Sequence, residues 1–265
     1  MKNSSIGVFD SGIGGLSVLK ALRAELPHEN FVYVADSGHA PYGERDEVHV
    51  MERSRVMTSY LLQQHHIKAL VIACNTATAA AIQGLRLAHP SLPIIGVEPA
   101  LKTAVAQSQT RRIGVMATRG TLASAKFKTL LASLADQADF ICQACDGLAD
   151  AIERDDAIEI RAHCAHYTGA IGRFGINSGD IDTLVLGCTH YPFASAVLRQ
   201  LVGPQVQLID NGQPVARQTR RMLPSLASTE APGQCVLLST GDPHILQKAA
   251  QRWLQLDAPA TSIQR

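Results

Sequence analysis

Ala69-Leu70-Val71-Ile72-Ala73-Cys74-Asn75-Thr76 is an uninterrupted apolar run that ends in a cysteine and small polar residues. The same pattern returns 114 residues later, in Thr183-Leu184-Val185-Leu186-Gly187-Cys188-Thr189-His190. Runs of this length and composition are typical of strands buried on both faces of a parallel sheet. The repeat predicts two related α/β halves, although any two strands of α/β proteins can resemble each other over so short a match.

The repeat continues on both sides of these runs. Ile94-Ile95-Gly96 falls on Leu208-Ile209-Asp210 at the same spacing, and Ile6-Gly7-Val8 matches Ile113-Gly114-Val115 at a spacing of 107 residues. Short apolar runs alternate with amphipathic stretches, which indicates a parallel α/β architecture. The predicted strands are Ile6–Phe9, Phe31–Ala35, Ala69–Ala73, Ile94–Val97, Ile113–Ala117, Thr183–Gly187, Gln207–Ile209 and Val236–Ser239. The predicted helices include Gly15–Leu26, Val48–Gln64 and Thr121–Leu134.

The predicted fold class is α/β, with two similar doubly wound domains that have mainly parallel sheets and are related by a pseudo-two-fold axis. Parallel sheets bind their ligands outside the carboxyl ends of the strands. The two halves would therefore face each other across a cleft that holds the active site. Following the repeat, the first lobe comprises residues 1–97 and 207–265, and the second comprises residues 98–206.

The composition is that of a packed globular protein, with 265 residues of which 46% are apolar and 18% charged. The net charge is +1 and no dense Lys/Arg stripe occurs, which argues against a nucleic-acid partner. No apolar stretch approaches the length of a membrane span, and the amino terminus lacks the pattern of a signal peptide. We expect a cytoplasmic protein without membrane contacts, in which most of the six cysteines are free thiols.

Cys74 and Cys188 are the candidate reactive groups, because each follows a predicted strand and precedes a predicted helix. A helix amino terminus favours thiolate over thiol and can hold a carboxylate. Two thiols that enter one cleft from opposite sides suit a reaction that needs a base on one face and an acid on the other. The alternative for either cysteine alone is a packing role at the end of a strand. Short donors for a substrate carboxylate lie near them, namely Ser11, Asn75, Thr76 and Thr189.

The loop Asp10-Ser11-Gly12-Ile13-Gly14-Gly15 directly follows the first predicted strand. Its glycines allow a close backbone approach to a ligand. The glycine spacing is not that of a dinucleotide-binding loop, and the carboxylate of Asp10 would repel a pyrophosphate. Asp10 would instead contact a substrate ammonium group or tune a nearby thiol, with helix capping as the alternative.

Two further segments carry side chains suited to a pocket. His190 lies two residues after Cys188, where it could bind the substrate or assist proton transfer at that thiol. The alternative for a single histidine is a structural role. Pro41-Tyr42-Gly43 follows the second predicted strand, and its tyrosine could form a pocket wall or simply belong to a turn.

A zinc site is the main alternative use of the remaining cysteines. Cys142 and Cys145 form a C-x-x-C pair, and His163, Cys164 and His166 follow downstream. A second C-x-x-C or a spaced histidine pair is missing, and the segment between the two groups is predicted to be helical. We therefore predict no metal site.

Six segments together resemble glutamate racemases of the aspartate/glutamate racemase superfamily, and the match runs nearly from end to end. The segments, in order, are Phe9–Gly15, Ala35-Asp36 through Pro41-Tyr42-Gly43, Cys74–Ala77, Ala117-Thr118 with Thr121, Gly187–Pro192 and Ser239-Thr240-Gly241-Asp242. Each is weak alone, but six in the right order are specific. A departure follows Gly43, where many members have a basic residue and then a serine and this chain has Glu44-Arg45-Asp46.

The resemblance implies a two-domain enzyme that interconverts L- and D-glutamate without pyridoxal phosphate, metal or nucleotide. By this similarity Cys74 would take the α-proton of D-glutamate and Cys188 that of L-glutamate. Asp10 would assist Cys74, whereas His190 and Glu153 would assist Cys188. The implied substrate-binding residues are Asp10, Ser11, Pro41, Tyr42, Gly43, Cys74, Asn75, Thr76, Thr118, Thr121, Cys188, Thr189 and His190. The family supplies D-glutamate for peptidoglycan, and a homodimer is one assembly consistent with this reading.

Three other functions remain open from the sequence. One is racemisation of aspartate or another amino acid by an enzyme of the same superfamily. Another is hydrolysis with Cys188 as nucleophile and His190 as base, which would leave Cys74 without a role. The third is a non-catalytic amino-acid-binding protein built from two α/β lobes.

Overall fold

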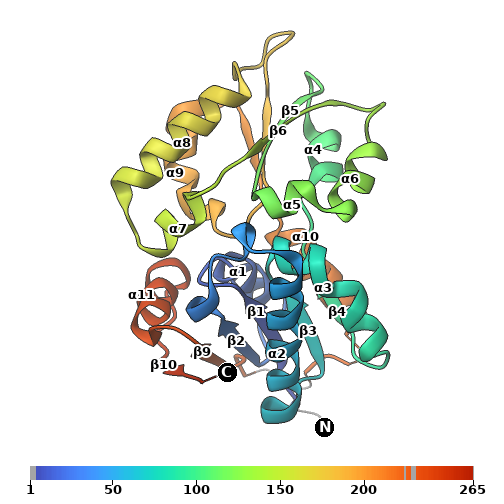
Figure 1. Cartoon of the computed structure of the whole chain (residues 1–265), viewed down its shortest axis with the longest axis vertical. Helices are drawn as coiled ribbons and strands as arrows, with labels where there is room; N and C mark the ends of the chain where they lie inside the picture. Colours follow the sequence, from blue (N-terminus) through green and yellow to red (C-terminus); the bar gives the residue numbers. More distant parts are fainter. Residues whose placement is uncertain (1–3, 224, 228–230, 265) are drawn as a thin grey trace.

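The computed structural model describes residues 4–223, 225–227 and 231–264, and it places two parallel sheets one above the other (Figure 1). The first sheet has the order β10-β9-β2-β1-β3-β4 and the second has the order β6-β5-β7-β8. The strands of the first sheet are β1 (Ile6–Asp10), β2 (Phe31–Ala35), β3 (Ala69–Ile72), β4 (Ile94–Gly96), β9 (Cys235–Ser239) and β10 (Ala260–Ser262). Those of the second are β5 (Arg112–Ala117), β6 (Asp139–Ala144), β7 (Thr183–Leu186) and β8 (Gln207–Ile209).

The internal repeat is visible in strand order and register. The order β2-β1-β3-β4 in the first sheet corresponds to β6-β5-β7-β8 in the second. Ile6 of β1 lies opposite Ala69 of β3, and their equivalents Ile113 and Thr183 lie opposite each other in the second sheet. The predicted fold of two similar parallel α/β domains is confirmed.

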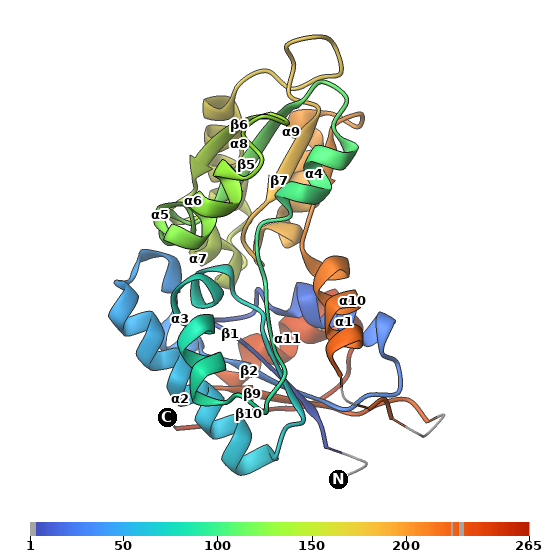
Figure 2. The same cartoon turned by 90° about the vertical axis from the view of Figure 1, so that its right-hand side faces the viewer.

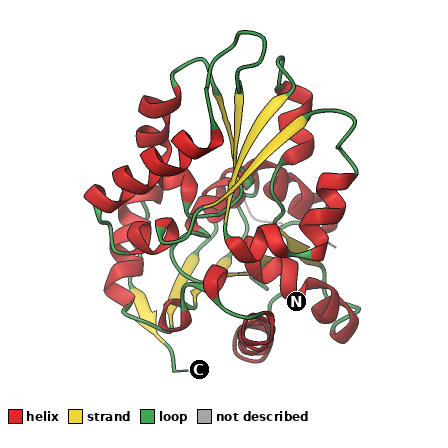
Figure 3. Cartoon of the chain, turned by 45° about the horizontal axis from the view of Figure 1, so that its top comes forward, coloured by secondary structure: helices red, strands yellow, loops and turns green. Residues whose placement is uncertain are grey.

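Helices cover both faces of each sheet (Figure 3), as in a doubly wound fold. The first sheet packs α1 (Leu16–Glu25), α10 (Gly212–Met222) and α11 (Pro243–Leu254) on one face, and α2 (Glu47–His65) and α3 (Asn75–Ala88) on the other. The second packs α7 (Leu148–Glu153), α8 (Ala157–Ile171), η3 (Tyr191–Ala194) and α9 (Ser195–Val202) on one face, and α4 (Leu101–Gln107) and α6 (Ala125–Ala132) on the other.

The central strands hold this arrangement because their side chains are buried on both faces. Every residue of β1, β2, β3 and β7 is buried. Full burial of a Val, Leu, Ile or Phe side chain stabilises a fold by about 1.5–3 kcal/mol. The continuous apolar runs of the sequence therefore fix these strands, and the chain after each of them must emerge at the carboxyl edge of a sheet.

The structure corrects one predicted helix and adds two strands that were not predicted. The sequence does not predict β6 and β10, because both are sheet edges with partly exposed side chains and at most three consecutive apolar residues. The single helix predicted over Thr121–Leu134 is two helices, α5 (Arg119–Ala123) and α6. The break falls at Ser124, whose backbone is extended and whose hydroxyl accepts a hydrogen bond from the N–H of Phe127 at 3.1 Å.

The chain passes between the lobes in two places, after β4 and after β8 (Figure 2). Strand β8, which begins at the predicted boundary Gln207, pairs with β7 in the second sheet. We therefore propose that the second lobe extends to Ile209 and that the chain returns to the first lobe with α10, which packs on α1. Parts of the predicted first lobe, namely residues 1–3, 224, 228–230 and 265, lie outside the described residues.

The lobes also touch far from the two linkers. The ring of Phe193 in the second lobe stacks on the ring of Trp253 in α11, with centroids 4.7 Å apart. The neighbouring Arg252 binds both carboxylate oxygens of Asp155 at 2.6 Å. Over the residues that the structure describes, no helix combines the length and the hydropathy needed to cross a membrane.

Candidate active site

A cavity of about 210 Å³ lies between the carboxyl ends of the two sheets, and both candidate cysteines line it. Cys74 directly precedes α3 and acts as its N-cap, whereas Cys188 lies between β7 and η3. The two residues are only 5% and 6% exposed. Each belongs to a different lobe, so one cavity has a thiol on each of two facing walls.

Cys74 is held by contacts from its own lobe. Its sulfur accepts a hydrogen bond from the N–H of Ala77 at 3.4 Å and lies 4.0 Å from the hydroxyl oxygen of Ser11. Burial, followed by the negative charge of Asp10, raises the pKa of the Cys74 thiol well above its usual value. The charge of Cys188 adds to this increase, so the two sulfurs lie within electrostatic reach of each other. Cys74 is therefore a neutral thiol that can donate a proton.

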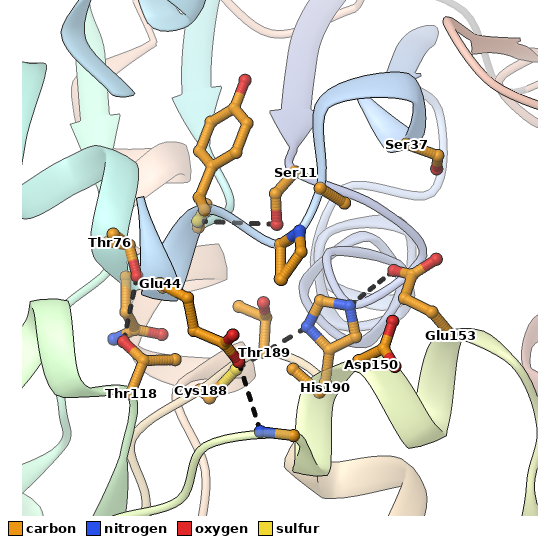
Figure 4. A pocket seen from close by; sticks show the side chains of 18 of the residues that line it. Ser11, Ser37, Glu44, Thr76, Thr118, Asp150, Glu153, Cys188, Thr189 and His190 are labelled. Atoms are coloured by element: carbon orange, nitrogen blue, oxygen red, sulfur yellow. Dashed lines mark hydrogen bonds and ion pairs between the residues drawn. The ribbon is translucent and has the colours of Figure 1, made fainter. Parts of the chain in front are cut away.

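Cys188 belongs to a relay of three side chains (Figure 4). Its sulfur lies 3.6 Å from Nδ1 of His190, and Nε2 of His190 lies 2.6 Å from Oε1 of Glu153. Burial lowers the pKa of His190, but the hydrogen bonds with Cys188 and Glu153 outweigh it and hold this pKa well above the usual value. His190 is thus a cation at neutral pH, positioned to exchange a proton with the Cys188 sulfur.

Asp10 lies one layer behind the cavity wall and is completely buried. Its carboxylate accepts hydrogen bonds from the hydroxyl groups of Ser11 at 2.9 Å and Thr189 at 2.8 Å. Burial raises the pKa of Asp10. No side chain caps the start of α1, so Asp10 is not the helix cap that was the alternative for it. Asp10 reaches the cavity through Ser11 on one lobe and Thr189 on the other.

The glycines after Asp10 bring the two lobes into direct contact. A Cβ atom on Gly12 would lie 1.8 Å from Oε1 of Glu153, and one on Gly14 would lie 2.3 Å from Nδ1 of His190. Between them, the N–H of Ile13 donates to Oε1 of Glu153 at 2.6 Å. The loop therefore serves the close approach of the second lobe, and its glycines leave space for the ring and carboxylate of the relay.

Threonines and an asparagine form the opposite part of the wall. The hydroxyl groups of Thr76 and Thr118 are 3.0 Å apart across the lobes, and Thr118 donates to Thr121 at 2.9 Å. Thr76 and Thr118 line the cavity, whereas Thr121 lies behind Thr118 and not on the wall. Asn75 is 4% exposed, and none of the described residues hydrogen bonds to either polar atom of its buried side-chain amide. An unpaired buried amide on the wall indicates a polar ligand.

Asp36 holds the Pro41–Gly43 wall of the cavity in place through several hydrogen bonds. The sequence did not predict a role for it. Its buried carboxylate accepts hydrogen bonds from the hydroxyl of Tyr42 at 2.5 Å and from that of Thr240 at 2.7 Å. Nε and Nη2 of Arg53 each donate to it at 2.9 Å. Burial and the charge of Asp36 raise the pKa of Tyr42, which stays a hydrogen-bond donor. Asp36 thereby ties the Pro41–Gly43 wall to the loop after β9.

The structure brings the expected site residues together, with Asp10 and Thr121 set behind the wall. Those that line the cavity are Ser11, Pro41, Tyr42, Gly43, Cys74, Asn75, Thr76, Thr118, Glu153, Cys188, Thr189 and His190. Polar lining residues that the sequence reasoning did not assign include Ser37, Glu44, Asp146, Asp150, Arg154 and Asp242. Ser37 and Asp242 belong to segments that carry the family resemblance but were given no role there, whereas Glu44, Asp146, Asp150 and Arg154 lie outside those segments. In the described part of the chain, no three His, Cys, Asp or Glu side chains form a group that could hold a metal ion.

Known proteins match this chain over most of its length. The profile of the family described as Asp/Glu/Hydantoin racemase matches residues 9–219. The chain belongs to this family. A glutamate racemase of Cupriavidus pinatubonensis is 48% identical over 263 residues, with 97% of this chain and 94% of the relative covered. A glutamate racemase of Ectopseudomonas mendocina is 50% identical over 218 residues, with 82% and 81% covered.

Solved structures of the Asp/Glu/hydantoin racemase family have the same architecture. A glutamate racemase isoform from Bacillus anthracis has a TM-score of 0.84 at 30% identity, covering 99% of this chain and 98% of its own. The Escherichia coli glutamate racemase, solved with L-glutamate and the activator UDP-MurNAc-Ala, has a TM-score of 0.82 at 26% identity, covering 99% and 97%. The enzyme class predicted from the sequence, an amino-acid racemase, is confirmed.

Gly14→Ala tests the close approach of the lobes. The added methyl group would overlap the buried ring of His190, so ring and loop must move apart. We expect kcat for racemisation, followed by circular dichroism, to fall about 100-fold, as for an ångström-scale misplacement at a reaction centre.

Gly84→Ala is the matched control, because Gly84 is an exposed residue within α3 and a Cβ there meets nothing within 4 Å. It should keep full activity and stabilise the fold by about 0.5–1 kcal/mol in urea unfolding. Full activity of Gly14→Ala would show that the loop does not position His190.

Arg53→Met tests the buried ion pair beneath the Tyr42 wall. The Asp36 side chain is 0% exposed and that of Arg53 is 11% exposed. Loss of the guanidinium would leave the carboxylate buried without its cation, and we expect the free energy of unfolding to fall by about 3–5 kcal/mol. Adding Asp36→Asn to Arg53→Met removes the unpaired buried carboxylate and should recover part of the lost free energy of unfolding. A urea midpoint unchanged in Arg53→Met would contradict this role for the pair.

Proposed function

We propose that this chain is a glutamate racemase that interconverts L- and D-glutamate with Cys74 and Cys188 as its two acid–base groups. The observation that carries the proposal is the presence of a thiol on each of two facing walls of one cavity. Its relatives at 48% and 50% identity are glutamate racemases, and this supports the substrate. A hydrolase using Cys188 and His190 would leave Cys74, which lines the same cavity, without a role.

The reaction requires removal of a weakly acidic proton from Cα. A carbanion-like state is stabilised by donors that are already oriented around the substrate carboxylate in a site with little water. The unpaired amide of Asn75 and the hydroxyl groups of Thr76, Thr118 and Thr189 supply such donors. We propose that they bind the α-carboxylate region. The Ser11 and Tyr42–Gly43 wall would then face the side chain of glutamate.

Proton transfer follows from the two facing thiols. In the L to D direction, the thiolate of Cys188 takes the α-proton, and the thiol of Cys74 donates its proton to the opposite face of Cα. The product leaves Cys188 as thiol and Cys74 as thiolate, which is the starting state for the reverse direction. Two groups avoid the movement that one base would need to reach both faces.

Neighbouring residues would adjust the two thiols differently. His190, hydrogen bonded to Glu153, can pass a proton to or from the Cys188 sulfur over their 3.6 Å contact. Asp10 acts on the Cys74 side through Ser11, which contacts both groups. Glu153 touches the first lobe at Ile13 as well. It would therefore couple lobe contact to the protonation of His190.

The proposed biological role is that of glutamate racemases. Racemisation would supply D-glutamate for peptidoglycan, a synthesis that begins in the cytoplasm, and we place the enzyme there. No cofactor takes part in the proposed steps. We also propose that the enzyme forms a homodimer.

The substrate assignment predicts inversion of either glutamate enantiomer by the purified protein without any added cofactor. Because enantiomers have equal free energies, the circular dichroism signal should decay to zero from both starting points. The same experiment with D- and L-aspartate should give a much lower kcat/KM. Faster turnover of aspartate would overturn the substrate, and binding without inversion would favour an amino-acid-binding protein.

Replacing one thiol at a time tests the two-base assignment. In Cys74→Ser and Cys188→Ser we expect kcat/KM to fall by about 10²- to 10⁴-fold, the usual contribution of a general acid or base. The loss must be equal in both directions, since the equilibrium constant stays at unity. Cys142→Ser, a change at an exposed thiol on β6, is the control and should be fully active.

Exchange of the α-hydrogen in deuterium oxide assigns each thiol to a face. Cys74→Ser keeps the Cys188 base and should exchange the α-hydrogen of L-glutamate faster than that of D-glutamate, without inversion. Cys188→Ser should show the opposite preference. The same preference in both variants, measured by NMR, would contradict the facing arrangement.

A further inference from the structure

Glu44 crosses the mouth of the cavity from the first lobe to the second. It follows the Tyr42–Gly43 wall, and its Oε1 accepts a hydrogen bond from the N–H of Gly147 at 3.2 Å (Figure 4). The two residues are 103 positions apart in the chain and belong to different lobes. Glu44 is itself exposed to solvent. Its carboxylate is therefore neither a buried structural group nor part of the proton relay.

The partner of Glu44 is a turn with an unusual backbone. Gly147 has a φ of +76°, in the left-handed region that favours glycine, and it immediately precedes α7. No side chain from its own segment caps this helix. Within the second lobe the turn is anchored by the hydroxyl of Tyr167, which donates to the carbonyl of Asp146 at 2.6 Å, and by the ion pair of Asp146 with Arg119.

The turn leads directly to the acid–base relay. The helix α7 ends at Glu153, which binds Nε2 of His190 and the N–H of Ile13. The first lobe thus holds α7 at both ends, through Glu44 at the start and Ile13 at the end. The Glu44 contact lies at the open rim of the cavity, and the Ile13 contact lies beside His190.

From this geometry we propose that Glu44 is a positioning residue. Its hydrogen bond to Gly147, called the strap below, holds the two lobes together at the mouth of the cavity and keeps α7 in place beside the substrate. The role deepens the proposed racemase function and rests on it for its effect on turnover. With the strap released, the lobes separate at the mouth, substrate is held less tightly, and solvent reaches the two thiols. Glu44 accepts this hydrogen bond through one carboxylate oxygen, which the amide oxygen of a glutamine can replace, so Glu44→Gln should keep the contact.

The test compares Glu44→Ala with Glu44→Gln, which keeps the acceptor oxygen and removes the charge. Glu52→Ala is the matched control, since Glu52 is an exposed acidic residue on α2 away from the cavity. We expect Glu44→Ala to raise KM for both enantiomers about 3- to 10-fold, the effect of losing one modest hydrogen bond, with a smaller change in kcat. Glu44→Gln and Glu52→Ala should stay within about 2-fold of the parent.

A second measurement is independent of turnover. Iodoacetamide alkylation of Cys74 and Cys188, followed by mass spectrometry and normalised to exposed Cys142, should be about 3- to 10-fold faster in Glu44→Ala and unchanged in Glu44→Gln. If neither variant changes the alkylation rate, or if Glu44→Gln behaves as Glu44→Ala does, the proposed role of Glu44 is wrong. If the protein does not racemise glutamate but Glu44→Ala still speeds alkylation, the strap stands and the proposed function fails.

Discussion

The site depends on the contact between the glycine loop of the first lobe and the His190–Glu153 pair of the second. The N–H of Ile13 meets Glu153 at 2.6 Å, the same oxygen that meets His190. Side chains larger than hydrogen at Gly12 or Gly14 would fill the space that the pair occupies. Lobe contact and the hydrogen bond to His190 therefore share one carboxylate oxygen, and opening the lobes would leave Glu153 without the Ile13 donor.

The parallel sheets explain why this contact occurs where the thiols are. All pairings in both sheets are parallel, so the chain leaves every strand at the same edge. Asp10 leaves β1 at that edge in the first lobe, and Cys74 follows β3 beside it. The second lobe repeats this layout with Cys188 after β7. Two carboxyl edges facing each other bring the loops of both halves to one cavity without any long insertion.

The parts of the molecule that obey this regularity could be predicted from the sequence. The buried strands, the repeat and the two cysteines followed from continuous apolar runs and their spacing. Other features could not be predicted, because tertiary contacts determine them. The edge strand β6 has only three consecutive apolar residues and is partly exposed along its length, and the break at Ser124 depends on one hydroxyl cap. The cluster around Asp36 unites residues up to 204 positions apart, and the Glu44 contact spans 103. No local pattern encodes such pairings.

Duplication supplies the scaffold, but the chemistry requires the two halves to differ. The repeat aligns Cys74 with Cys188, yet Thr76 falls on His190 and Asp10 falls on Ala117. One thiol is consequently buried beside a carboxylate, and the other lies beside an imidazolium. Glutamate has no two-fold symmetry, so its carboxylates and ammonium group must be held in one orientation while Cα inverts. A symmetric cavity would bind the substrate in two orientations. Divergence of the residues around matched thiols allows one binding mode to serve both faces.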